Sequence, residues 1–177
     1  MTTVNQRRRG SPGKDRMEQE IFMKRALELA REAAEHGEVP VGCVVVKDGR
    51  IIGEGRNQRE EKRDVRSHAE LEAMAQACKT LGSWRLEGCD LYVTLEPCPM
   101  CAGAIINGRM RKIFYGARDE AMGACGGVLN LFMEDFPCKP QIFGNILGEE
   151  SREILGDFFK KLRNDREKTL KCFSLLR

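Results

Sequence analysis

The sequence predicts a single α/β domain built on a mixed β-sheet. Apolar, β-branched segments alternate along the chain with segments whose apolar residues recur at helical spacing. The first two apolar segments are joined by Asp48-Gly49, a strong hairpin signal, so we expect the first strand pair to be antiparallel. The later strands are each separated by a helix, which indicates an α/β layered domain, so the sheet as a whole is expected to be mixed.

The chain begins with a basic arm that has little to bury. Residues 1–16 contain the run Arg7–Arg9 and then Gly10, Ser11, Pro12 and Gly13. We expect this arm to be disordered. A solvated tail is the simplest interpretation, contact with RNA phosphates is a second, and organelle targeting is a third. Targeting is disfavoured because the arm is short and contains an acid at Asp15.

The remaining elements follow from periodicity and punctuation, within one domain over residues 17–166. Residues 17–36 have helical spacing, and Gly37 supplies the stop. Further helices are expected at 67–79, 98–107 and 149–166, and strands at 41–47, 50–55, 90–95 and 112–115. The stretch from 116 to 145 is rich in glycine and proline, and there we expect loop, a short apolar segment at 128–133 and a brief strand at 141–143. Residues 167–177 are assigned to a C-terminal tail.

Composition excludes several classes of protein. The hydrophobic content of 41% and charged content of 32% are those of a globular domain. No apolar stretch approaches the ~20 residues of a membrane span, and no apolar segment follows the basic arm as in a secretory signal. Six of the eight cysteines are scattered singly, so a reducing cytoplasm is a simpler expectation than a disulfide framework. The formal net charge of +3 is too small to require a nucleic-acid partner.

A candidate metal clamp follows the expected strand at 90–95. Cys98 and Cys101 are three residues apart at the start of a predicted helix, so both can face one ion. The positive end of the helix dipole favours the thiolate form, which is the form that binds metal. The pair therefore predicts a zinc site, which needs further ligands.

The chain offers two histidines as a third ligand. His68 lies at the start of an Ala-rich helical stretch, where Ser67 is placed to cap the helix, whereas His36 ends the first helix in an ordinary position. Glu70 is two residues beyond His68, about 200° round a helix, so it is better assigned as an acid or base than as a ligand. Three ligands, His68, Cys98 and Cys101, leave a fourth position for water, as in a catalytic site.

These residues match a family. His68-Ala69-Glu70 combined with the Pro-Cys-x-x-Cys run ending at Cys101 resembles the zinc-dependent nucleobase deaminases, for which this signature and its mechanism are already known. Val39–Gly42, Gly53–Gly55, Asn57, Gly116–Asp119 and Asp157–Phe159 narrow the resemblance to the bacterial tRNA adenosine deaminases, over about residues 17–163. The resemblance implies a three-layer α/β/α cytidine-deaminase-like fold with a mixed central sheet of about five strands, a homodimer, and a tRNA anticodon stem-loop as partner.

By the same resemblance, further residues would hold the RNA. Asn57 would hold the flipped nucleotide, and the Ala69 backbone would contact the base edge. Arg118 and Asp119 would hold the anticodon backbone and a ribose, and Phe159 would pack against an extruded base. Each has a simpler explanation: Asn57 caps the loop after the hairpin, Asp119 is a turn residue, and Phe159 is core. Cys43 and Gly127 stand where the family commonly has Ala and Ser.

The implied reaction is hydrolysis of adenosine to inosine at the wobble position. Zinc would supply a water of lowered pKa, and Glu70 would shuttle its proton to the ring and to the departing ammonia. Two alternatives stay open. One is a deaminase of a free base or nucleotide such as cytosine or guanine, which needs no Arg118 or Asp119. The other is a structural zinc module completed by Cys89 or Cys125, in which Glu70 has no purpose.

Overall fold

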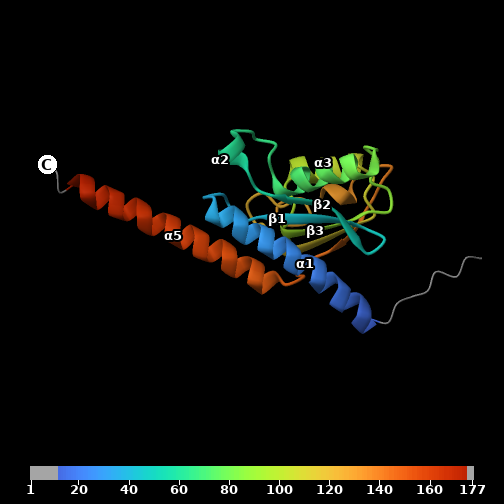
Figure 1. Cartoon of the computed structure of the whole chain (residues 1–177), viewed down its shortest axis with the longest axis horizontal. Coiled ribbons are helices and arrows are strands. Elements are labelled where there is room, and N and C mark those ends of the chain that lie inside the picture. Colours follow the sequence, from blue (N-terminus) through green and yellow to red (C-terminus); the bar gives the residue numbers. More distant parts are fainter. Residues whose placement is uncertain (1–11, 175–177) are drawn as a thin grey trace, which may run out of the picture.

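The computed structural model describes the backbone of residues 12–174 and the side chains of residues 16–165 (Figure 1). In chain order its elements are α1 (Pro12–Glu35), β1 (Gly42–Lys47), β2 (Arg50–Arg56), α2 (Arg59–Lys62), α3 (Ala69–Leu81), β3 (Asp90–Leu95), α4 (Pro99–Asn107), β4 (Lys112–Ala117), the 3-10 turn η1 (Leu131–Met133), β5 (Gln141–Phe143) and α5 (Gly148–Ser174).

The strands form one five-stranded mixed sheet in the order β2-β1-β3-β4-β5. Strand β1 is antiparallel to both β2 and β3, while β3, β4 and β5 are parallel. The predicted hairpin is present, and both Asp48 (φ 50°) and Gly49 (φ 74°) adopt the left-handed conformation of a tight two-residue turn. The expected mixed sheet and the brief strand at 141–143 are confirmed.

Helices cover both faces of the sheet, as the predicted three-layer fold requires. Figure 1 shows α1 and α5 together on one side and α3 on the other. Between the sheet and α3 and α4 lies one buried core, which includes Ala73, Leu91 and Ile105. The opposite core contains Phe22 from α1 and the stacked rings of Tyr92 and Phe114, whose centroids are 4.5 Å apart. Two separate cores, one on each face, fix the sheet as the middle layer.

Close packing of α3 against the hairpin depends on glycine. A Cβ on Gly55 would lie 2.3 Å from the carbonyl oxygen of Ala69, a distance at which no side chain fits. Gly53 meets the carbonyl oxygen of Ala73 in the same way, at 2.2 Å. The first turn of α3 therefore rests directly on the backbone of β2, which sets the position of the residue that precedes the helix.

Both terminal helices extend beyond their predicted boundaries. Helix α1 begins at Pro12, before the predicted helix start at Met17, and residues 1–11 lie outside the described residues. Proline fits the first turn of a helix, and turns without apolar residues are added to a packed helix at little cost. Extending an existing helix costs much less than starting one, and α5 continues past Arg166 to Ser174, through most of the predicted tail. No helix in the described part of the chain is long and apolar enough to cross a membrane.

Candidate metal centre and substrate pocket

The candidate ligands lie at the N-termini of two neighbouring helices. His68 is the N-cap residue of α3 and Cys98 the N-cap residue of α4, both with extended backbone angles, and Cys101 is buried in the first turn of α4. The sequence placed Ser67 at the cap and Cys98 inside the helix, and both assignments are off by one position. The end of β3 leads into Cys98, so the cluster lies at the carboxyl edge of a strand, where open α/β sheets commonly bind ligands.

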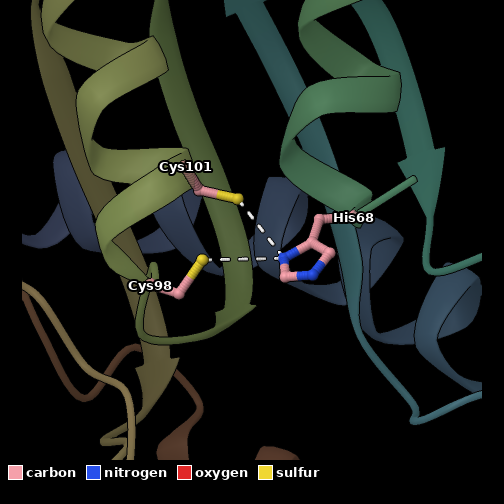
Figure 2. Close-up of side chains that lie close together, drawn as sticks. All are labelled: His68, Cys98 and Cys101. Carbon is pink, nitrogen blue, oxygen red and sulfur yellow. Dashed lines mark hydrogen bonds between the residues drawn. The ribbon is translucent and has the colours of Figure 1, made fainter. Parts of the chain in front are cut away.

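The three ligand atoms converge on one point, as Figure 2 shows. The Nδ1 atom of His68 is 3.6 Å from the Cys98 sulfur and 3.5 Å from the Cys101 sulfur. All three ligand atoms lie within 4.8 Å of one another. A tetrahedral zinc with Zn–S of ~2.3 Å and Zn–N of ~2.0 Å would separate nitrogen from sulfur by about 3.5 Å. The donor set and its spacing therefore fit a tetrahedral metal ion.

The cluster favours a thiolate even without the ion. Hydrogen bonds from Cys101 and then from His68 lower the pKa of Cys98 to about 4. The hydrogen bond to Cys98 and burial raise the pKa of Cys101 well above its usual value. The same contact with Cys98 raises the pKa of His68. These directions favour the thiolate on Cys98, with Cys101 and His68 as its hydrogen-bond partners.

Glu70 lies beside the cluster. It is buried in the first turn of α3, and burial is the largest cause that raises the pKa of its carboxyl group to about 6. If His68 and Glu70 both belonged to a regular helix, their side chains would point about 200° apart and could not both face one ion. Because His68 is the non-helical cap, both side chains face the same cavity.

A cavity of about 440 Å³ opens over the cluster. Its floor is formed by His68, Glu70 and Cys98, and the predicted substrate residues Asn57, Ala69 and Asp119 line its walls. Its apolar lining includes Val41, Val65, Pro99 and Met122. A largely apolar pocket with a few convergent polar groups is typical of a site for a flat, partly polar ligand.

A second hollow continues from the first along the surface. It is lined by Arg118, Asp119, Arg152, Leu155 and Phe159, with Val39, Leu95 and Asp119 shared between the two. Lys160, Lys161 and Arg163 follow on the exposed face of α5. The structure thus brings His68, Cys98, Glu70 and all five predicted substrate residues to two adjoining hollows, while Cys101 is buried next to His68.

The structure bears on the simpler explanations of Asn57, Asp119 and Phe159. Asn57 donates to the carbonyl oxygen of Val39 at 3.3 Å, so it braces a loop and also lines the cavity. Asp119 is a turn residue whose carboxylate accepts from the backbone of Ala121 and Met122. Phe159 is not core: it is 41% exposed.

Several residues of the pocket were missed by the sequence analysis. Arg59 lies on the short helix α2 and Val65 in the loop after it, a stretch without periodicity, and neither Met122 nor Arg152 belongs to a motif. Glu96, which directly precedes the Pro-Cys-x-x-Cys run, also lines the cavity. The signal that could have identified it is an acid placed directly after a buried apolar strand, where burial demands partners.

Other candidate ligands lie outside the cluster. The His36 side chain is exposed, with Nδ1 2.8 Å from the carbonyl oxygen of Glu32. Cys89 precedes β3, at the opposite end of that strand from Cys98. Within the described residues neither Cys89 nor Cys125 joins the cluster, so a four-ligand structural site finds no support.

Comparison with known proteins gives the family. The model of the MafB19-like deaminase family matches residues 17–163. A tRNA-specific adenosine deaminase of Bacillus subtilis is 44% identical over 156 residues, which is 88% of this chain and 97% of that protein. The chain belongs to this deaminase family. One similar solved structure comes from studies of A-to-I editing by tRNA:A34 deaminases at the wobble position of transfer RNA; it has 45% identity and a TM-score of 0.75, and covers 76% of this chain and 99% of that one.

A guanine deaminase is also among the similar solved structures. The structure of a guanine deaminase from Bacillus subtilis is 44% identical to this chain, with a TM-score of 0.55, and covers 64% of this chain and 73% of that one. Membership of the deaminase family therefore leaves the substrate to be decided by the residues around the pocket.

Proposed function

We propose that this chain is a zinc-dependent tRNA adenosine deaminase that converts adenosine to inosine at the wobble position of an anticodon. The observation that carries this proposal is the continuity between the two depressions. The His68, Cys98 and Cys101 cluster lies below a cavity that joins, through Asp119, a hollow bearing Arg118 and Phe159. A relative that shares 44% of its residues is a tRNA-specific adenosine deaminase.

Zinc is the metal that best fits the donors. One imidazole and two thiolates are soft to borderline ligands, which suit zinc, and three protein ligands leave one position for water. When bound there, zinc lowers the pKa of that water from 15.7 towards ~7.

Glu70 is proposed as the proton shuttle. Its carboxylate takes a proton from the attacking water and delivers it to the purine ring. It then assists the departure of ammonia as the bond between C6 and the exocyclic nitrogen breaks. Adenosine and water give inosine and ammonia, so no other reactant is needed. Burial beside the cluster keeps bulk water from competing for the proton.

The other pocket residues are proposed to hold an extruded nucleotide. An adenine stacked in a loop cannot reach a buried centre, so it must turn out of the stack. Asn57 and the Ala69 backbone would hold it, and their position in the lining of the cavity supports this. Arg118 and Asp119 at the adjoining rim would hold the anticodon backbone and a ribose, and the exposed ring of Phe159 would stack on a splayed base.

Inosine formation tests the proposal. We expect the wild-type chain to form inosine in total tRNA and in an anticodon stem-loop, with binding that weakens as salt rises because cationic groups neutralise phosphates. Free adenosine, cytosine and guanine should be poor substrates. Efficient turnover of a free base with no inosine in tRNA would favour the alternative of a free-base deaminase.

A homodimer in the reducing cytoplasm is the assembly we propose. Met100, beside the ligands and 37% exposed, is available for an interface. Ile105 and Ile106 follow on the same helix but are buried in their own subunit, so they do not contribute to one. The seven cysteines with described side chains are free, as expected in that compartment. Sedimentation at micromolar concentration should show a dimer, and a monomer would contradict this.

A further inference from the structure

Glu96 is a buried carboxylate with no assigned role. It follows β3 directly and precedes the metal ligand Cys98 by two residues, and only 2% of it is exposed. Among the described side chains no cation forms an ion pair with it. A buried carboxylate is costly unless other donors satisfy it, so its partners should reveal its purpose.

Backbone amides of a single loop satisfy this carboxylate. Its Oε1 accepts from the N–H groups of Cys125, at 2.7 Å, and Gly127, at 2.8 Å. Its Oε2 accepts from the N–H group of Asp119 at 3.0 Å. We call residues 118–127 the rim loop. Hydrogen bonds to an ionised acceptor are roughly twice as strong as neutral ones, so three of them hold both ends of this loop.

The rim loop is folded tightly around Glu96. A Cβ on Gly123 would lie 2.5 Å from the Glu96 carboxyl carbon and 2.3 Å from the Asp119 carbonyl oxygen. The N–H group of Ala124 donates to the carbonyl oxygen of Pro97 at 2.8 Å. The loop thus contacts the two residues immediately before Cys98 and leaves no space between itself and the carboxylate.

This loop carries side chains proposed to meet the substrate. Arg118 and Asp119 line the outer hollow, and Asp119 and Met122 line the inner cavity. The Arg118 guanidinium donates to the carbonyl oxygen of Gly126, so its direction depends on the path of the same loop. The segment 96–98 therefore fixes the loop through Glu96 and provides a metal ligand through Cys98.

We propose that Glu96 is a positioning residue that holds the rim loop in register with the metal centre and so determines how well a polynucleotide, rather than a free base, is bound. This inference rests on the proposed function. Glu96 also lines the inner cavity, but both of its carboxylate oxygens accept from rim-loop amides, so its contribution is to binding of the nucleotides around the target.

The test replaces Glu96 with an isosteric amide. In Glu96→Gln the remaining oxygen can keep Cys125 and Gly127, but the new NH₂ group then faces the Asp119 N–H group, donor against donor. Because the Asp119 N–H group would then lack an acceptor, the rim loop should shift and bind substrate less well. We expect KM for an anticodon stem-loop to rise roughly tenfold to a hundredfold. Zinc content and kcat should stay near those of the wild type. The control is Glu87→Gln, an exposed carboxylate paired with Arg109, which should leave KM unchanged.

Amide hydrogen exchange provides a readout independent of turnover. In Glu96→Gln, exchange should accelerate in residues 118–127 and stay unchanged in α3 and α4. If Glu96→Gln lowered apparent kcat and zinc content together and left KM unchanged, the variant would simply be partly unfolded. That result would overturn the inference. Unchanged exchange in the rim loop would overturn it too.

A second variant serves if Glu96→Gln does not fold. Gly123→Ala keeps the carboxylate but pushes a methyl group between it and Asp119, and should reproduce the KM rise and the faster exchange. An unchanged KM in this variant would contradict the inference. If the wild type forms no inosine in the stem-loop, the proposed function fails, whereas the exchange data still decide whether Glu96 anchors the loop.

Discussion

The metal cluster and the rim loop meet at one cavity but are built in opposite ways. His68 and Cys98 are cap residues of two regular helices, and those helices rest on a shared core that includes Ala73 and Ile105. The rim loop contains no helix or strand and is held by hydrogen bonds to Glu96. The first region is fixed by the packing of regular helices, whereas the second has no regular structure and depends on these polar contacts together with the burial of Ala124 and Cys125.

This difference implies a division of labour. A ligand displaced by a fraction of an ångström loses the metal, so ligands belong on elements that packing makes rigid. A substrate with a backbone and several bases must be admitted and released, which a loop allows more readily. We therefore expect changes in the cluster to abolish chemistry and changes in the rim to weaken binding, and the following variants test that separation in order of decreasing effect.

Removal of a ligand should have the largest effect. The wild-type chain should carry one zinc ion, and Cys98→Ser should lose it, with activity falling to background, because a neutral hydroxyl is a poor replacement for a thiolate. Metal analysis after dialysis measures this. Cys138→Ser, a cysteine outside the cluster, should keep its zinc. Full zinc retention in Cys98→Ser would remove Cys98 from the site.

Removal of the proton shuttle should separate chemistry from metal binding. Glu70→Gln keeps the shape of the side chain but cannot accept the proton, so turnover should fall by about 10² to 10⁴ while zinc and fold remain. Single-turnover inosine formation and metal analysis are the two measurements. Glu72→Gln, on the same helix and paired with Lys62, should be nearly unchanged. Zinc loss in Glu70→Gln would instead make Glu70 a ligand.

The metal cluster could be predicted from the sequence more fully than the rim loop. The spacing of Cys98 and Cys101 is local, so helix geometry predicts that pair, and His68 could be added because the chain offers only two histidines. Boundaries were less accurate: the cap position of His68 depends on Gly55 and the close approach of α3 to β2, a long-range contact that no local pattern reports. The same contact explains why His68 and Glu70 both face the cavity.

The rim could not be predicted from local pattern. Phe159 has helical spacing that fits a core residue, and only the resemblance to a family suggested an exposed role for it. Arg118 and Asp119 are separated from Phe159 by about 40 positions, and the parallel pairing of β3 with β4 and the return of α5 bring them together. Glu96 shows the limit most clearly, because its partners are backbone amides, which have no signature in the sequence.

Loss of an exposed ring should weaken substrate binding without disturbing the cluster. Phe159→Ala should lower kcat/KM on an anticodon stem-loop by about tenfold to a hundredfold, since stacking contributes roughly 1 to 3 kcal/mol per base. Zinc should remain bound. Phe136→Ala is a matched control, because that ring is similarly exposed (39%, against 41% for Phe159) and lines neither depression. Equal activity of Phe159→Ala and the wild type would remove Phe159 from the rim.

The smallest effect is expected from the loss of an ion pair between α1 and β2, outside the rim loop. Arg25 on α1 donates to both carboxylate oxygens of Glu54 on β2, at 2.8 and 2.9 Å, and this contact lowers the pKa of Glu54. Because both side chains are about one-third exposed, Glu54→Gln should lower the free energy of unfolding by only about 0.5 to 1 kcal/mol at pH 7. Thermal unfolding should shift by a few degrees at most, roughly 1 to 4 °C.

The pH dependence of this effect has a definite sign. A carboxyl group with a lowered folded-state pKa stabilises the fold above its unfolded pKa of about 4.3 and loses that contribution as pH falls through the folded value. The difference between wild type and Glu54→Gln should therefore be full at pH 7 and shrink progressively below about pH 4.3. Glu28→Gln, which removes a more exposed partner of Arg25, should lower the free energy of unfolding by less.

KM for the stem-loop should not change in either variant. A rise in KM for Glu54→Gln would mean that the ion pair and the rim loop are energetically coupled, and the proposed separation would be wrong.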